Sequence, residues 1–286
     1  MENYSLERVY GQGIGVVGSA PFLYTAVKKW MAAPESLKIS DISSVAVNAQ
    51  NLVHVFNRGP NPVVIFDQEG TYVGAWGGDI FSDAHGISIN AKGEVYLGDR
   101  DAHQVFKCTA DGTVLMALGS RNLPSLEAPF NHPTDVFESP SGDIFVSDGY
   151  ANSRVHHFSP DGEHIKSWGK RGTAPGEFNV PHSIWADKEK VYVSDRENGR
   201  IQIFDYEGNF INALGGLYRP TDIYQDADQN MFVTELVPRL TVFDKTGTKV
   251  AVARLEGTPH GVWGDSDGNL YIASTEASNV TKLAKN

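Results

Sequence analysis

The sequence contains very little cysteine. Its 286 residues include a single one, Cys108, so no disulfide can form within the chain. Disulfides stabilise many secreted domains, whereas proteins of the reducing cytoplasm do without them. The first ten residues, MENYSLERVY, also lack the basic segment and apolar stretch of a secretory signal. We therefore expect a cytoplasmic protein in which Cys108 is a packed thiol.

Long apolar runs and an excess of positive charge are missing as well. No run approaches the roughly 18 apolar residues of a membrane-spanning helix. The chain has 24 lysines and arginines against 35 aspartates and glutamates, which gives a net charge of −11. Nucleic-acid binding requires a basic face. We therefore expect neither a nucleic acid nor a membrane as a partner, and the oligomeric state stays open.

Six copies of one pattern fill residues 43–286. A complete copy holds an apolar strand, a turn, a second strand ending in a polar or acidic residue, a third strand, and a fourth strand closing on glycine. The first strands begin near Val45, Ile87, Val136, Ile184, Ile223 and Val262, at intervals of 39 to 49 residues. Such a period with four short strands is typical of a β-propeller blade. The repeats therefore predict an all-β fold, a six-bladed propeller.

The sixth copy lacks its fourth strand. Residues 4–13 contain apolar residues and end in glycine, so this N-terminal segment can supply the missing strand. Its pairing with the last blade would close the ring and cover an exposed sheet edge. We therefore expect one domain over residues 1–286, closed by this strand. Residues 21–38 depart from the pattern, and we expect a connecting segment, a short helix over the ring, or a lid.

Histidine recurs at one position of the repeat. Two residues before the first strands lie, in order, Ser43, His85, Thr134, His182, Thr221 and His260. Alternate blades of a six-bladed ring face its axis from three directions, so the three imidazoles should meet there. Three neutral imidazoles with an open position are the ligands of a catalytic zinc site, and other divalent transition metals also suit imidazole. We predict a metal site; the alternative is a cluster that holds only water.

Further polar residues follow the second strands. Five of these strands end in Asn57, Asp99, Asp148, Asp195 and Glu235, which we expect to cap backbone amides. The residues that come next in the first four copies are Arg58, Arg100, Gly149 with Tyr150 after it, and Arg196. A guanidinium near the ring axis needs a carboxylate partner or an anionic substrate. The arginines therefore indicate an anionic ligand.

Several stretches resemble the NHL-repeat propeller of the peptidyl-α-hydroxyglycine α-amidating lyases, or peptidylamidoglycolate lyases. They are NRGP (57–60), HGISINAKGEVYLGDRDAHQVFK (85–107), SDGYANSRV (147–155), VPHSIWADKEKVYVSDRENGRIQIF (180–204) and PHGVWGDSDGNLYIA (259–273). This family splits peptidyl-α-hydroxyglycine into a peptide amide and glyoxylate. The likeness runs from about Val45 to the end of the sequence.

The resemblance implies a role for each candidate residue. The three histidines would hold zinc, Tyr150 would be catalytic, and Arg58 and Arg196 would bind the carboxylate and oxygen atoms of the substrate. A metal on the carbinol hydroxyl lowers the pKa of that hydroxyl, and a nearby phenol can take the proton. The carbinolamide, N–CH(OH), then collapses to an amide and an aldehyde without any nucleophile.

The sequence departs from the family at several points. Gly261 stands where the family has an aspartate tied to a structural calcium, which leaves a central Ca²⁺ open. Ala84 stands where the family tends to have proline, and the long insertion after Gly59 is absent. The disulfides of the extracellular members are also missing. These differences indicate a reshaped site. The substrate would be either a peptide-like molecule or a small, non-peptide hemiaminal. In both cases it would carry a carboxylate.

Two other functions are compatible with a six-bladed propeller. A metal-dependent hydrolase or lactonase would use carboxylate and asparagine ligands at the axis, typically for calcium, and three histidines in register argue against it. A non-enzymatic NHL scaffold would bind a partner on one face and would need neither the histidines nor the arginines.

Overall fold

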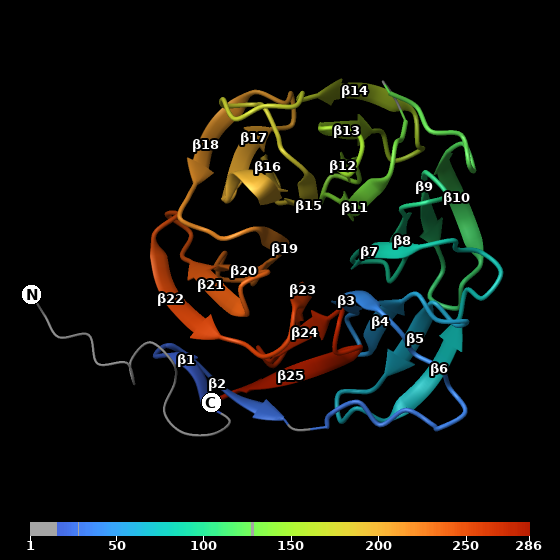
Figure 1. Ribbon diagram of the computed structural model, residues 1–286, viewed down its shortest axis with the longest axis vertical. Helices are drawn as coiled ribbons and strands as arrows, with labels where there is room; N and C mark the ends of the chain where they lie inside the picture. The colour runs from blue at the N-terminus through green and yellow to red at the C-terminus, as the bar shows by residue number, and fades with distance from the viewer. Residues whose placement is uncertain (1–15, 28, 127–128) are drawn as a thin grey trace, which may run out of the picture.

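The computed structural model describes residues 16–27, 29–126 and 129–286. Six antiparallel sheets stand around a common axis, and each runs from an inner strand near the axis to an outer strand (Figure 1). Besides strands, the described residues contain one short 3-10 helix, η1 (Arg196–Asn198), and no α-helix. The predicted all-β, six-bladed propeller is therefore confirmed. Among the described residues, no helix is long and apolar enough to cross a membrane.

The first five blades each contain four strands in chain order. The first blade consists of β3 (Ile42–Val47), β4 (Val53–Asn57), β5 (Val63–Phe66) and β6 (Tyr72–Trp76). The second consists of β7 (Ala84–Ile89), β8 (Val95–Asp99), β9 (Gln104–Cys108) and β10 (Val114–Gly119). The third consists of β11 (Pro133–Glu138), β12 (Ile144–Asp148), β13 (Arg154–Phe158) and β14 (His164–Trp168).

The remaining blades complete the ring. The fourth consists of β15 (Pro181–Ala186), β16 (Lys190–Asp195), β17 (Arg200–Asp205) and β18 (Phe210–Leu214). The fifth consists of β19 (Pro220–Gln225), β20 (Met231–Glu235), β21 (Arg239–Phe243) and β22 (Lys249–Arg254). The sixth combines three strands from the end of the chain, β23 (Pro259–Gly264), β24 (Leu270–Ser274) and β25 (Asn279–Lys285), with β2 (Phe22–Val27) and β1 (Val16–Ser19).

The hydrophobic core is divided among the blade interfaces. Each of six clusters of buried residues joins two neighbouring blades, as Phe145 of the third blade joins Ile184 and Val193 of the fourth. The strands are rich in β-branched and aromatic residues, which pack well on both faces of a buried sheet. Cys108 is part of one such cluster, and burial raises the pKa of its thiol to about 12. The prediction of a packed thiol is therefore confirmed.

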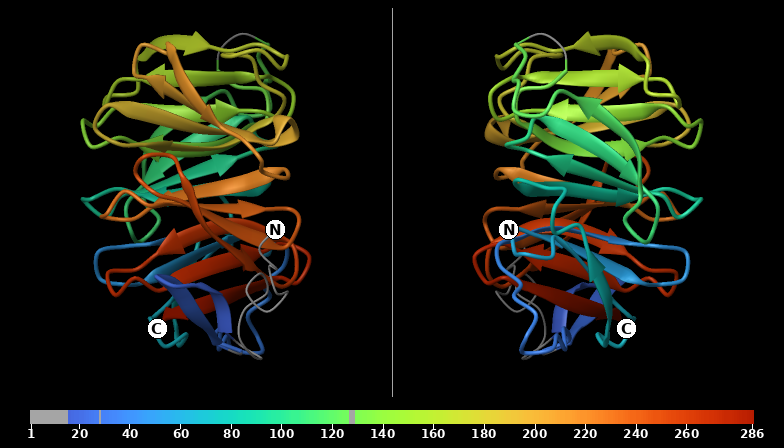
Figure 2. Two further views of the ribbon diagram at one scale, coloured as in Figure 1. Left: turned by 90° about the vertical axis from the view of Figure 1, so that its left-hand side faces the viewer. Right: turned by 90° about the vertical axis from the view of Figure 1, so that its right-hand side faces the viewer.

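The ring is closed by an N-terminal strand, as predicted, but the structure places this strand later in the sequence. β2 pairs with β25 in antiparallel register, from Tyr24 opposite Lys285 to Val27 opposite Lys282. In Figures 1 and 2, the hairpin of β1 and β2 lies beside β25 and close to the C-terminus. Part of the segment 21–38, expected as a connection, helix or lid, is therefore the closing strand. Residues 4–13 lie outside the described residues.

The alternation of side chains explains why this segment is a strand. Phe22, Tyr24 and Ala26 alternate along β2 and pack against the core between the fifth and sixth blades, which is the period of a strand and not of a helix. Further along, Trp30 is buried against the rings of Phe66 and Tyr271, with centroids 5.7 and 5.1 Å away. This part of the segment connects the closing strand to the first blade along the side of the ring.

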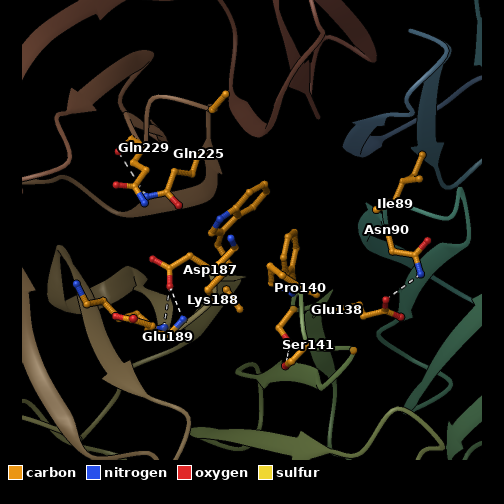
Figure 3. Close-up of a pocket in the computed structure, with 18 of the residues that line it drawn as sticks. Ile89, Asn90, Glu138, Pro140, Ser141, Asp187, Lys188, Glu189, Gln225 and Gln229 are labelled. Atoms are coloured by element: carbon orange, nitrogen blue, oxygen red, sulfur yellow. Dashed lines mark hydrogen bonds between the residues drawn. The ribbon is translucent and has the colours of Figure 1, made fainter.

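Aromatic side chains fill the ring axis at one end of the inner strands. Phe137, Trp185, Tyr224 and Trp263 all lie at the fifth position of an inner strand. Ring centroids of Trp185 and Trp263 are 5.3 Å apart, and Phe137 reaches Trp263 from the opposite blade at 6.4 Å. Beyond them lies a depression of about 910 Å³, lined by turns of the second to fifth blades (Figure 3). The histidines lie at the other end of the same strands.

Closure by β2 should contribute to the stability of the whole ring. Tyr24 is 3% exposed at the centre of β2, so Tyr24→Ala should lower the free energy of unfolding by roughly 3 kcal/mol or more. Thr25 is exposed and makes one side-chain hydrogen bond, to Asn286, so Thr25→Ala serves as the control, with an expected loss of about 1 kcal/mol or less. Urea unfolding followed by circular dichroism would measure both. Equal midpoints for Tyr24→Ala and the parent would contradict this account.

Candidate metal centre

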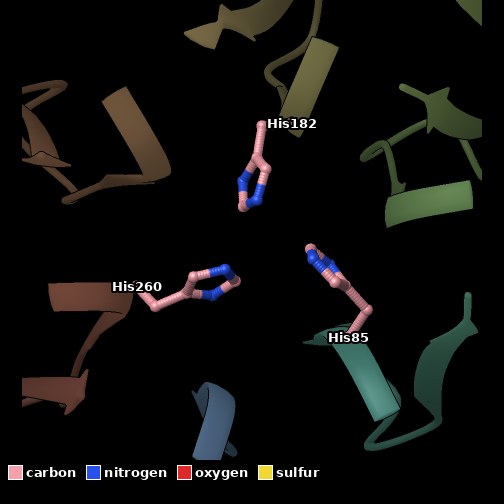
Figure 4. A group of neighbouring side chains, drawn as sticks. All are labelled: His85, His182 and His260. Carbon is pink, nitrogen blue, oxygen red and sulfur yellow. The ribbon is translucent and has the colours of Figure 1, made fainter. Parts of the chain in front are cut away.

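The histidines predicted from the repeat meet at the ring axis. His85, His182 and His260 are the second residues of β7, β15 and β23, in the second, fourth and sixth blades. One ring nitrogen of each lies within 4.8 Å of the corresponding atoms of the other two. The ring centroids are 4.8 to 5.1 Å apart, so the arrangement is close to an equilateral triangle. Figure 4 shows the three imidazoles pointing toward one another from three separate blades.

The other three blades fix the orientation of these imidazoles. Nδ1 of His85 lies 2.6 Å from the carbonyl oxygen of Thr134, Nδ1 of His182 lies 2.7 Å from that of Thr221, and Nδ1 of His260 lies 2.6 Å from that of Ser43. A carbonyl oxygen only accepts, so each Nδ1 must carry the proton. Each Nε2 therefore presents its lone pair to the axis, as metal-binding histidines do.

The imidazoles are neutral. Burial lowers the pKa of His260 to about 4, and the charges of Arg58, Arg196 and Arg100 lower it as well. Burial also lowers the pKa of His85 and His182 well below the usual value. Neutral imidazole is the form that binds a metal.

Tyr150 reaches the same point. Its hydroxyl oxygen lies 2.9 Å from Nε2 of His85 and 3.0 Å from Nε2 of His182. A phenol has one proton, so only one of these contacts can be a hydrogen bond to an unprotonated nitrogen. Among the described residues, Nε2 of His260 has no hydrogen-bond partner. Several lone pairs thus converge with one proton between them, and a divalent cation at this point would satisfy them.

The backbone at Gly149 allows the side chain of Tyr150 to reach the imidazoles at the ring axis. A Cβ atom on Gly149 would lie 2.0 Å from the carbonyl oxygen of Pro181, so only glycine lets the chain pass this close to the fourth blade.

The carboxylates at the ends of the second strands cap backbone amides. Asp148 accepts a hydrogen bond from the backbone N–H of Asn131 at 3.0 Å. The predicted capping role is confirmed here, and also where Asp195 caps Asn179, at 2.7 Å, and Asp99 caps Asp83, at 2.9 Å. These caps hold the loops that lead into the inner strands.

Two arginines predicted from the repeat lie beside the histidines. Nη1 of Arg196 donates to the hydroxyl oxygen of Tyr150 at 3.3 Å, and the guanidinium carbon lies 5.3 Å from the centre of the phenol ring. The charge of Arg58 lies close enough to lower the pKa of His85 and His260. The structure thus brings all six candidate residues together at one end of the axis.

Two further residues belong to this group, of which the repeat indicated Arg100 and not Asp83. The guanidinium carbon of Arg100 lies 5.5 Å from the centre of the Tyr150 ring. Asp83, which is buried, forms ion pairs with both Arg100 and Arg58. Arg100 occupies the same position of the repeat as Arg58 and Arg196, so that signal was available. Asp83 occupies the same position as Asp41 of the first copy, and the other four copies have no carboxylate there, so the repeat alone did not single it out.

The layer below the histidines does not reproduce the calcium ligand that the resemblance suggested. A Cβ atom on Gly261 would lie 2.8 Å from Cα of Ser44, so an aspartate does not fit there. Two buried carboxylates occupy this layer instead. Asp135 accepts from the backbone N–H of Ile184 at 3.1 Å, and burial raises its pKa well above the usual value. A structural Ca²⁺ therefore stays an open prediction, without an aspartate at this position to bind it.

The second carboxylate of this layer joins three blades. Asp222 accepts from the backbone N–H of Val262 at 2.9 Å and from the hydroxyl of Ser183 at 2.6 Å. Burial raises its pKa to about 6. The two carboxylates thus serve as links between blades near the axis.

Comparison with known proteins places this geometry in a family. A family model described as a 6-bladed beta-propeller matches residues 130–232. The chain is 36% identical over 300 residues to the probable peptidyl-alpha-hydroxyglycine alpha-amidating lyase pgal-1 of Caenorhabditis elegans, which covers 87% of this chain and 83% of that protein. It is 34% identical to the peptidylglycine alpha-amidating monooxygenase of Rattus norvegicus, over 85% of this chain and 30% of that one.

The fold is shared more widely than the sequence. The chain spans about a third of the length of the vertebrate monooxygenases it matches. A solved structure of a gluconolactonase from Xanthomonas campestris superposes with a TM-score of 0.69 at 15% identity, covering 98% of this chain and 92% of that one. At that identity the likeness concerns the fold alone.

Each histidine of the triad should be needed for metal binding. We expect His85→Ala, His182→Ala and His260→Ala each to lower the affinity for Zn²⁺ at least about tenfold, since two imidazoles hold a metal poorly. His164→Ala, which alters an exposed histidine on the outer strand β14, is the control and should bind as the parent does. Metal analysis after dialysis, with circular dichroism to verify folding, would measure this. A triad variant with full metal content would exclude that histidine as a ligand.

Proposed function

The chain belongs to the family of peptidyl-α-hydroxyglycine α-amidating lyases, and on this premise we propose that it is a metal-dependent lyase acting on a carbinolamide or hemiaminal. The reaction would split N–CH(OH) into an amide or amine and an aldehyde such as glyoxylate. The observation that carries the proposal is the convergence of three neutral imidazoles, one phenol and guanidinium groups at one end of the ring axis. The substrate would be a peptide-like or small non-peptide molecule with a carboxylate.

The donor set favours Zn²⁺ as the metal. His85, His182 and His260 would hold it through Nε2, and iron, cobalt or nickel would also suit three imidazoles. When bound, the metal would act as a Lewis acid on the hydroxyl oxygen of the substrate.

Tyr150 is suited to accept the hydroxyl proton. Its oxygen already lies at the point where the imidazoles converge. A phenol accepts a proton as phenolate, and the N–H that Arg196 donates to this oxygen would stabilise the negative charge of that form. As the O–H bond breaks, its electron pair forms the aldehyde C=O, the C–N bond breaks, and the nitrogen takes a proton. Atoms and protons balance without water or an external nucleophile.

Arg58 is suited to bind the carboxylate of the substrate. Its Nε is bonded to Asp83, and neither Nη1 nor Nη2 has a hydrogen-bond partner among the described residues. These two nitrogens form the fork that binds a carboxylate in a bidentate manner. Because aromatic residues fill the axis on the far side, we propose that the substrate approaches from the end that carries the arginines.

The lactonase alternative rests on the likeness in fold. Imidazole nitrogens, not carboxylates, surround the axis where such an enzyme would hold calcium, so the lyase is the better-supported function.

The single cysteine agrees with our proposal that the protein works in the reducing cytoplasm.

Tyr150→Phe should separate metal binding from chemistry. The change removes one hydroxyl and almost no volume, so the metal should stay while kcat falls roughly 100-fold or more if the phenol is the base. Tyr218→Phe is the control, because Tyr218 is 54% exposed. Glyoxylate released from N-benzoyl-α-hydroxyglycine would be measured with zinc content in parallel. Parent-like turnover of Tyr150→Phe would remove the phenol from the mechanism.

The two arginines should give different kinetic signatures. Arg58→Ala should raise KM roughly tenfold or more with a smaller effect on kcat, since the lost contact is a charge-assisted bond to the bound carboxylate. Arg196→Ala should lower kcat as well, because Arg196 also donates to Tyr150. Steady-state kinetics on the same substrate would measure both. An unchanged KM for Arg58→Ala would show that the carboxylate binds elsewhere.

A further inference from the structure

We propose that the substrate of this site carries a second anionic group, in addition to the carboxylate on the carbinol carbon, and that Arg100 binds it. The inference rests on the proposed function. It concerns Arg100, a guanidinium beside the metal centre that the proposed reaction does not use.

Two observations place Arg100 in the site. Its guanidinium lies against the ring of Tyr150, 5.5 Å from its centre. It also shares the carboxylate of Asp83 with Arg58.

Arg100 retains the capacity to bind a ligand. Its Nε donates to Asp101 at 3.0 Å, and Nη2 pairs with Asp83. Within the described part of the chain, Nη1 has no hydrogen-bond partner, and the side chain is 31% exposed. A guanidinium has five N–H donors in a fixed fork, so this edge of Arg100 is available to an acceptor that comes from outside.

The guanidinium groups around the metal centre share their carboxylate partners in pairs. Asp83 is shared between Arg58 and Arg100, and Glu197 is likewise shared between Arg196 and Arg219. The third carboxylate, that of Asp101, belongs to a side chain that is 52% exposed, so water screens its charge.

A divalent metal would add to this positive charge, and the carboxylate on the carbinol carbon would neutralise one unit. In a protein of net charge −11, such a local excess of cations attracts anions. The remaining charge is matched by a second anionic group on the substrate.

The alternative is that Arg100 only supports Arg58 through Asp83. The two roles predict different results. A supporting residue would affect every substrate alike, because every substrate has the first carboxylate. A residue that binds a second anion would affect only substrates that carry one.

The test compares matched pairs of N-acyl-α-hydroxyglycines with the zinc-loaded parent. Malonyl, succinyl and glutaryl derivatives carry a second carboxylate at increasing distances, and propanoyl, butanoyl and pentanoyl derivatives are their neutral counterparts of equal length. We expect kcat/KM for the best dianionic substrate to exceed that of its neutral partner roughly tenfold or more, the value of one charge-assisted hydrogen bond. Arg100→Gln should abolish this preference, so kcat/KM should fall much further for the dianionic substrate than for its neutral partner.

Two further variants refine the test. Arg100→Lys keeps the charge and loses the fork, so it should retain part of the preference. Arg121→Gln removes the same charge from the neighbouring loop, where Arg121 donates to the carbonyl of Ile80, and it should retain the whole preference. An equal loss on both series with Arg100→Gln would overturn the inference, as would a parent that turns over both series at equal rates.

Binding of unreactive analogues keeps this test separate from the proposed function. N-succinylglycine and N-butanoylglycine lack the carbinol hydroxyl and differ from each other by one carboxylate. Calorimetry should show that the parent binds N-succinylglycine more tightly than N-butanoylglycine. Arg100→Gln should bind the two analogues with equal affinity. If no hydroxyglycine released glyoxylate while this difference persisted, the lyase proposal would fail and the anion site would stand. If glyoxylate formed and neither assay showed a preference, the anion site would fail alone.

Discussion

The hydrogen bond from Nδ1 of each central histidine to a backbone carbonyl of the next blade is the contact on which the rest of the site depends. His85, His182 and His260 come from even blades, and the accepting carbonyls belong to odd ones. The bond sets the tautomer, aims the opposite nitrogen at the axis, and fixes the ring against rotation. Because backbone carbonyls make these bonds, the imidazoles are held by the propeller itself, and the precision of the site follows from the closure of the ring.

The same contact explains the alternation of His with Ser or Thr in the sequence. An imidazole from every blade would leave no room at the axis, and the intervening Thr134 instead turns its hydroxyl away, toward Ser147 and the carbonyl of Pro181. The repeat therefore encodes two kinds of blade. One kind presents imidazoles, and the other orients them.

The sequence allowed the fold and the central residues to be predicted for a specific physical reason. Strand periodicity and equal spacing are local properties, and the propeller converts equal register into a common position on the axis, so His85, His182 and His260 could be placed without a structure. The closing strand was harder, because Phe22, Tyr24 and Ala26 alternate over only a few residues and pair with β25 at the far end of the chain. Asp83 was hidden because its role comes from two arginines of different blades, and no spacing within one repeat encodes such a contact.

The pairing of β2 with β25 also constrains the order in which the molecule can be assembled. β2 precedes the first five blades in the sequence, and its partner, Asn279–Lys285, follows them. Until the sixth blade forms, β2 has no sheet to join, and His260 belongs to that same blade. Contacts between segments so distant in sequence form late in folding. A metal centre of His85, His182 and His260 would therefore be complete only once the sixth blade has formed and closed the ring.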